Sequence, residues 1–169
     1  MKKLLSIAAA GLLLFCASFQ ASAIEGPDPV GSVTASAHLG FLPGMGANAS
    51  IDYVLVNKWW KGHFTVGAYT GFYTGNTAFD SIPESSFSIM PRVTYGLNIN
   101  DSFEVHVGAM SGFRYFKDSD GDHKPGFSMA YLAGCRYFIT DNLGLSAETG
   151  SLGIITPTTY LNIGVAYRF

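Results

Sequence analysis

An alternation of apolar residues with polar or small residues, repeating every two positions, runs through the chain from Gly31 to its end. In the last segment Leu161, Ile163, Val165, Tyr167 and Phe169 alternate with Asn162, Gly164, Ala166 and Arg168. A period of two is typical of a β-strand whose two faces lie in different surroundings, whereas an amphipathic helix repeats about every 3.6 residues. Turn-forming residues divide the chain into eight such segments, which predicts an all-β protein. We expect strands near residues 31–41, 47–57, 63–73, 86–98, 102–116, 126–139, 142–152 and 158–169.

The connections between these segments are short, so each strand is expected to pair with the next one along the chain. An even number of antiparallel strands arranged up and down closes most simply into a barrel, because closure leaves no exposed edge. We therefore predict one eight-stranded antiparallel β-barrel domain over residues 24–169. The net charge of -2 and the lack of a basic run exclude nucleic acid as a partner.

Residues 1–23 have the parts of a cleavable signal peptide. Two lysines precede an apolar run from Leu4 to Phe19, and Ala21-Ser22-Ala23 is a small-x-small cleavage site. This pattern predicts export from the cytoplasm. A membrane-anchoring helix is the alternative, but the apolar run is short for a membrane span. Cys135 is the one cysteine after this segment, so we expect no internal disulfide.

The charged residues indicate which face of the barrel points inward. All four arginines fall within predicted strands on the polar face, whereas every lysine after residue 23 falls in a predicted connection. An enclosed interior favours arginine, because its planar guanidinium group can bind several carboxylates at once. Carboxylates and His38 share this face, so the enclosed charges would nearly balance. We predict a polar network in the barrel interior formed by Asp52, Arg92, Glu104, His106, Arg114, Arg136, Glu148 and Arg168.

The apolar face would then point outward into lipid and make the barrel a transmembrane one. Aromatic residues near both ends of the strands support this orientation, with Phe64 and Phe72 or Tyr160 and Phe169 as examples. Eight to ten tilted residues place such rings roughly 20–25 Å apart, which matches the aromatic girdles of an apolar band about 25 Å tall. A soluble barrel with the apolar face inward is the competing fold.

The end of the chain resembles the β-signal that the outer-membrane insertion machinery recognises. Asn162, Gly164, Tyr167 and Phe169 provide its polar residue, glycine, aromatic residue and terminal phenylalanine. Nearly all of the chain after residue 23 resembles the small outer-membrane β-barrel family of the OmpA/OmpX type, from Gram-negative bacteria. The resemblance implies a location in the cell outer membrane. It also implies contact with outer-membrane lipids and lipopolysaccharide, and with the insertion machinery and periplasmic chaperones during biogenesis.

We expect a monomeric, non-enzymatic protein with a structural or surface-interaction role, a side-chain-filled interior and no cofactor or metal. A small conductive or transport barrel is the first alternative. A lipid A-modifying enzyme is the second, and Ser36 with His38 is the pairing that would serve it. A nucleophile, a base and an orienting acid at one place are needed for hydrolysis, and no motif provides them together.

Three features of the connections carry further expectations. Trp59 and Trp60, flanked by lysines, are predicted membrane-interface anchors, because indoles and amines suit the headgroup layer; alternatively, these rings fold back onto their own hairpin. The Asp118–Asp122 segment alternates carboxylates around a glycine but departs from the calcium-loop pattern, so we expect a solvated hairpin tip there. We expect His63 and His123 to be solvated.

Overall fold

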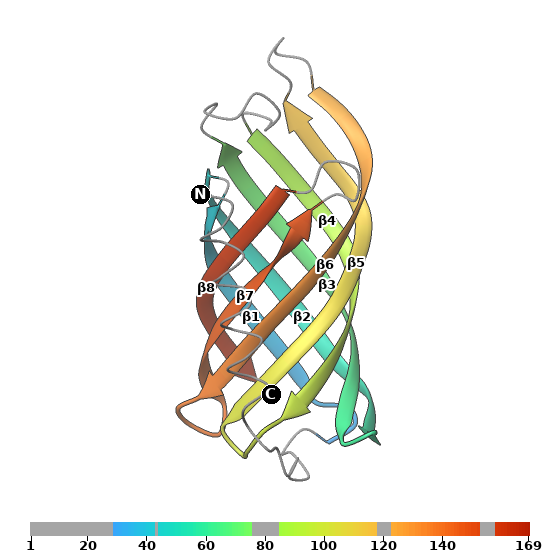
Figure 1. Ribbon diagram of the computed structural model, residues 1–169, viewed down its shortest axis with the longest axis vertical. Helices are drawn as coiled ribbons and strands as arrows, with labels where there is room; N and C mark the ends of the chain where they lie inside the picture. The colour runs from blue at the N-terminus through green and yellow to red at the C-terminus, as the bar shows by residue number, and fades with distance from the viewer. Residues whose placement is uncertain (1–28, 43, 76–84, 118–122, 153–157) are drawn as a thin grey trace, which may run out of the picture.

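The computed structural model describes residues 29–42, 44–75, 85–117, 123–152 and 158–169. Within these residues the chain forms eight antiparallel strands in one closed barrel (Figure 1). The strands are β1 (Val33–Leu42), β2 (Gly44–Trp59), β3 (Gly62–Gly75), β4 (Ser85–Asn98), β5 (Phe103–Lys117), β6 (His123–Phe138), β7 (Leu143–Leu152) and β8 (Thr158–Arg168). Every strand pairs with its neighbours in sequence and β1 pairs with β8, which confirms the predicted up-and-down barrel. No helix in the described part of the chain has the length and hydropathy to span a membrane.

The β2–β3, β4–β5 and β6–β7 turns lie at one end of the barrel, together with the C-terminus (Figure 1). We call this the turn end and the opposite end the loop end. Polar side chains close two of the turns. Asn100 Oδ1 accepts hydrogen bonds from the backbone N–H groups of Ser102 (2.9 Å) and Phe103 (2.8 Å), and Thr140 Oγ1 accepts one from Leu143 N–H (2.9 Å). Such side-chain bonds are why Asn and Thr favour turns over strands.

The strands extend further than the sequence pattern predicts. Lys58 lies within β2, Lys117 ends β5 and Lys124 lies within β6, so only Lys61 of these lysines lies in a connection as expected. His123, also expected in a connection, begins β6. The reason is that β5 and β6 continue to pair up to Lys117 and His123. The candidate calcium segment at residues 118–122 falls outside the described residues.

The two ends of the chain meet at the β1–β8 seam. The register runs from Thr34 opposite Arg168 to His38 opposite Gly164, and Phe169 N–H donates to Val33 O at 2.8 Å. A Cβ atom at Gly164 would collide with the backbone of Ala37. Glycine at this position therefore lets β8 approach β1 closely enough to close the barrel.

The two faces of the barrel wall differ in polarity as the alternation predicts. Outward side chains at mid-strand are apolar and about half exposed, as at Ile51 (50%) and Ile163 (51%). Inward side chains are buried and include most of the charged residues of the strands, such as Asp52 and Arg92. The barrel thus has an apolar outer belt around a polar interior, which is the arrangement of a membrane-spanning barrel.

The interior also contains an apolar cluster. It consists of Tyr69, Met90, Met110, Ala130, Leu132 and Tyr160, and we call it the apolar layer. The prediction that Tyr160 belongs to the outer aromatic girdle is wrong: its side chain is fully buried. The physical reason is the alternation of side chains along β8: Tyr160 lies on the same face as inward Asn162, and Ile163 lies on the outward face. Gly150 leaves room for the ring, because a Cβ there would meet it.

Candidate functional site in the barrel interior

Two arginines hold three carboxylates at the centre of the interior. Arg92 Nε lies 2.9 Å from Asp52 Oδ1, and its Nη2 donates to Glu148 Oε1 at 2.9 Å. Arg136 donates to Asp52 Oδ2 through Nη2 (2.6 Å) and to Glu104 Oε1 through Nη1 (3.1 Å). The five side chains come from β2, β4, β5, β6 and β7, so the cluster cross-links more than half of the barrel wall. Each carboxylate has a guanidinium partner, as burial of charge requires.

His106 completes this group, which we call the ionic cluster: Asp52, Arg92, Glu104, His106, Arg136 and Glu148. The imidazole lies between two carboxylates, with Nδ1 3.3 Å from Glu104 Oε1 and Nε2 3.2 Å from Glu148 Oε1. Carboxylate oxygens only accept hydrogen bonds, so both ring nitrogens face acceptors. Two arginines and three carboxylates leave one negative charge, and a doubly protonated His106 brings the cluster to zero.

His63 extends the ionic cluster toward the turn end. It was expected to be solvated, but that expectation is wrong: the side chain is buried, and its Nε2 lies 3.9 Å from Glu104 Oε2. The cause is again the alternation of side chains, because His63 lies on the inward face of β3 with Thr65 and Tyr69. Gly96, opposite His63 in the register, leaves the space that the imidazole fills.

A second polar chain starts at His38. Its Nδ1–H donates to Asn48 Oδ1 (3.0 Å), so the Nε2 of a neutral imidazole accepts from Ser146 Oγ (2.9 Å). Asn48 Nδ2 donates to the Tyr73 hydroxyl (3.0 Å), which donates to Asn162 Oδ1 (2.9 Å). Ser146, His38 and Asn48 are linked in the order of a catalytic triad, with a nucleophile, a base and an orienting group. However, Ser146 is only 2% exposed. A substrate has no access to this hydroxyl in the closed barrel.

Ser36 does not take part in that chain. It was the serine considered with His38 for a hydrolytic role, yet His38 hydrogen-bonds Asn48 and Ser146 instead. Ser36 Oγ is buried without a hydrogen-bond partner among the described residues. The described residues also contain no group of three His, Cys, Asp or Glu side chains arranged to hold a metal ion.

The remaining two arginines lie apart from the ionic cluster, at opposite ends of the barrel. Arg114 lies toward the loop end, where its Nη2 donates to Ser86 Oγ at 3.3 Å. Arg168 is buried at the turn end, and its guanidinium carbon lies 3.7 Å from the centre of the Phe138 ring. Of the eight residues predicted to form one interior network, the structure therefore brings six together and places two elsewhere.

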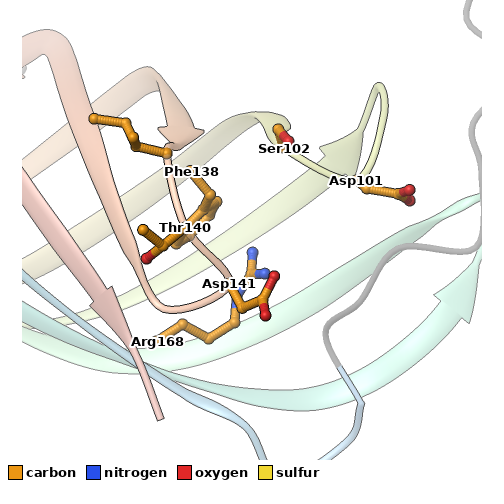
Figure 2. Close-up of a pocket in the computed structure, with 7 residues that line it drawn as sticks. Asp101, Ser102, Phe138, Thr140, Asp141 and Arg168 are labelled. Carbon is orange, nitrogen blue, oxygen red and sulfur yellow. The ribbon is translucent and has the colours of Figure 1, made fainter.

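Arg168 also lines a pocket of about 360 Å³ at the turn end (Figure 2). The lining residues are Asp101, Ser102, Phe138, Ile139, Thr140, Asp141 and Arg168. The two carboxylates come from different turns, and Figure 2 shows Asp101 pointing away from Arg168. The two carboxylates therefore do not converge on one point, as they would in a dedicated ligand site.

Comparison with known proteins identifies the fold family. A family model described as the outer membrane protein beta-barrel domain matches residues 7–169, almost the whole chain. The chain belongs to this family. No curated protein matches the chain significantly.

Three solved outer-membrane barrels illustrate the likeness. The N-terminal barrel domain of Pseudomonas aeruginosa OprF is 15% identical, with 82% of this chain and 98% of that one covered and a TM-score of 0.61. Neisserial surface protein A is 17% identical, with coverages of 83% and 98% and a TM-score of 0.60. Yersinia pestis Ail, in a phospholipid bilayer nanodisc, is 16% identical, with coverages of 82% and 99% and a TM-score of 0.55. At these identities the likeness concerns the fold.

The C-terminal residues of this family member divide between the two faces of β8. Asn162 is fully buried and accepts the Tyr73 hydroxyl, whereas Tyr167 and Phe169 point outward with their ring centres 4.8 Å apart. Gly164 lies at the close β1–β8 contact described above. The four residues that resemble the insertion signal therefore also have structural roles in the finished barrel.

The two tryptophans of the β2–β3 turn have different surroundings. The Trp59 ring packs 4.6 Å from that of Phe64 and 6.2 Å from that of Tyr95, so it folds back onto the barrel wall. Trp60 is 86% exposed. The Tyr95 hydroxyl donates to the backbone oxygens of both tryptophans, at 3.1 and 2.9 Å. These bonds hold a turn in which Trp60 and two lysines have positive φ angles, a conformation that side chains usually avoid.

We expect Trp59→Ala to lower the free energy of unfolding by about 1–2 kcal/mol, because the ring loses two aromatic contacts. Trp60→Ala should cost less, about 0.5 kcal/mol, because its ring has no such contact with another ring of the described residues. Urea unfolding in lipid vesicles, followed by circular dichroism, measures both. A larger cost for Trp60 than for Trp59 would contradict this account of the turn.

Proposed function

We propose that the protein is an integral protein of the cell outer membrane with a structural and surface-contact role and no enzymatic activity. The observation that carries this proposal is the occupied interior. The ionic cluster fills the barrel toward the turn end, and the apolar layer fills it toward the loop end. An eight-stranded barrel has room for little more than its own side chains. The charged groups of the ionic cluster pair with one another, which leaves the outer surface and the loops as the parts available for interaction.

The apolar belt supports a position within lipid, and the chain's features assign an orientation. We infer that the signal peptide directs export and that the insertion machinery recognises the segment from Asn162 to Phe169, after periplasmic chaperones have delivered the chain. The turn end would face the periplasm, with Trp60 in the headgroup layer, and the loop end would face the exterior and its lipopolysaccharide. We propose that the barrel acts as a monomer, since its closed sheet needs no partner strand.

Fractionation followed by gel electrophoresis tests the membrane assignment. The folded protein should be recovered with the outer membrane, and its unboiled form should migrate differently from the boiled form, because a closed barrel resists unfolding by detergent. Recovery in the soluble periplasmic fraction would contradict the assignment. Mass spectrometry of lipid A from cells with and without the protein tests for enzymatic activity, and altered acyl chains would overturn the non-enzymatic proposal.

Planar-bilayer recordings separate this function from that of a conductive barrel. We expect no discrete current steps from the purified protein, because Met90, Met110 and Tyr160 close the interior above the ionic cluster. Stepwise currents that scale with the amount of protein would contradict the filled interior. A parallel preparation without the protein controls for detergent artefacts.

A further inference from the structure

Arg114 lies in a different compartment from the ionic cluster. It is on the inward face of β5, and Met110 of the apolar layer separates it from His106 on the same strand. The separation of eight positions from His106 to Arg114 corresponds to roughly 26 Å along an extended strand. The cross-strand neighbours of Arg114 are Ser88 on β4 and Gly126 on β6, which carry no charge. The cluster's carboxylates therefore cannot neutralise this guanidinium.

The contacts of Arg114 differ from those of Arg92 and Arg136, the two arginines of the ionic cluster. Arg92 and Arg136 each have a carboxylate within 3 Å. Among the described residues, Arg114 has the Ser86 hydroxyl at 3.3 Å and no carboxylate partner; its Nε, like those of Arg92 and Arg136, is buried without a hydrogen bond. A half-buried cation without a counter-charge is unfavourable unless something supplies the charge.

The groups around this guanidinium have the chemistry of an oxyanion site. Ser86 and Ser128 lie on inward faces of the adjoining strands β4 and β6 at this level of the barrel, so their hydroxyls can donate hydrogen bonds without adding charge, whereas Ser88 Oγ already donates to Gly71 O. A guanidinium group offers two parallel N–H donors that match two oxygens of a phosphate. Gly126, opposite Arg114 in the register, has no side chain that could cover the guanidinium group from that strand.

We propose that Arg114 is the centre of an oxyanion-binding site near the loop end of the barrel, which takes a phosphate group. Two parallel N–H groups of the Arg114 guanidinium would bind two phosphate oxygens, and the Ser86 and Ser128 hydroxyls would donate to the others. The phosphate can come from inorganic phosphate or from lipopolysaccharide. That it arrives from outside the cell rests on the proposed function, whereas the site itself does not.

The test uses residues 24–169, the chain without the predicted signal peptide, refolded in detergent micelles. Folding is checked by circular dichroism and gel mobility. Inorganic phosphate is titrated while the Arg114 side-chain N–H resonance and the backbone N–H resonances of Ser86 and Ser128, which the Arg114→Gln chain keeps, are followed by NMR. We expect saturable binding, and Arg114→Gln should raise the dissociation constant about tenfold or more, the effect of losing one charged hydrogen bond. Lys61→Gln removes one positive charge from the exposed turn at the far end and should leave binding unchanged. Ser86→Ala, which keeps the guanidinium, should weaken binding to a smaller degree.

A second arm compares vesicles with and without lipopolysaccharide. A change in the Arg114 resonance with inorganic phosphate supports a free anion, and a change only with lipopolysaccharide supports a lipid-borne phosphate. No change in either arm would overturn the proposal, as would equal affinities of the native chain and Arg114→Gln. A loss of stability in Arg114→Gln without any phosphate effect would also overturn it, since the counter-charge would then be a carboxylate of the chain. Because folded protein is measured, these outcomes are distinct from a failure of the membrane assignment.

Discussion

Replacing Arg136 with leucine should lower the free energy of unfolding of the barrel by about 3–5 kcal/mol, the cost of removing one partner from a buried ion pair. Arg136 contacts Asp52 and Glu104 directly and lies 4.0 Å from Glu148. After the substitution, three buried carboxylates would share the guanidinium group of Arg92. The remaining charges would repel one another in a region that water does not reach.

Urea unfolding in lipid vesicles measures this effect, and two further variants make it specific. Arg136→Lys keeps the charge but cannot donate from two separated nitrogens to Asp52 and Glu104. Its stability should therefore lie between that of the native chain and that of Arg136→Leu. Lys61→Gln removes a charge from an exposed turn and should change the free energy by less than about 0.5 kcal/mol. A stability of Arg136→Leu equal to that of the native chain would show that the ionic cluster does not hold the barrel together.

Tyr160→Ala should destabilise the barrel by about 3 kcal/mol, as expected for removing a large buried ring. The ring is fully buried in the apolar layer, and Gly150 leaves no side chain to fill the space.

Tyr160→Phe is the matched control, because it keeps the ring. The Tyr160 hydroxyl is buried and has no hydrogen-bond partner among the described residues. Its removal should leave the stability unchanged or slightly higher, since no hydrogen bond is lost. If Tyr160→Ala were as stable as Tyr160→Phe, packing of the ring in the apolar layer would not stabilise the barrel as we infer.

The period-two alternation carried enough information to predict the barrel and its polarity. Strand pairing followed from short connections, and the enclosure of Asp52 and Arg92 followed from their places on the polar face of each strand. The same alternation also places His63 and Tyr160 on the inward face. Both were predicted wrongly because their residue type was given more weight than their place in the alternation. Histidine near a turn favoured a solvated position, and tyrosine near a strand end favoured the outer girdle.

The partners inside the barrel could not be predicted from the sequence. Which carboxylate meets Arg92 or Arg136 depends on the register of all eight strands and on the shear with which the barrel closes. The same holds for the contacts of His38 with Ser146, which are 108 positions apart. Arg114 is separated from the ionic cluster because Met110 and Tyr160 fill the interior between them. A count of total charge says nothing about where along the barrel axis each charge lies.

The most direct test of the account is the orientation of the barrel wall in lipid. In a Cys135→Ser background, a spin label is attached to cysteine at Val107, an outward position, or at Thr94, an inward one, and the protein is placed in vesicles. At Val107 we expect faster relaxation of the label by lipid-soluble oxygen than by a water-soluble nickel chelate, and at Thr94 we expect little relaxation by either. Preferential relaxation by the nickel chelate at Val107 would contradict an apolar face in contact with lipid.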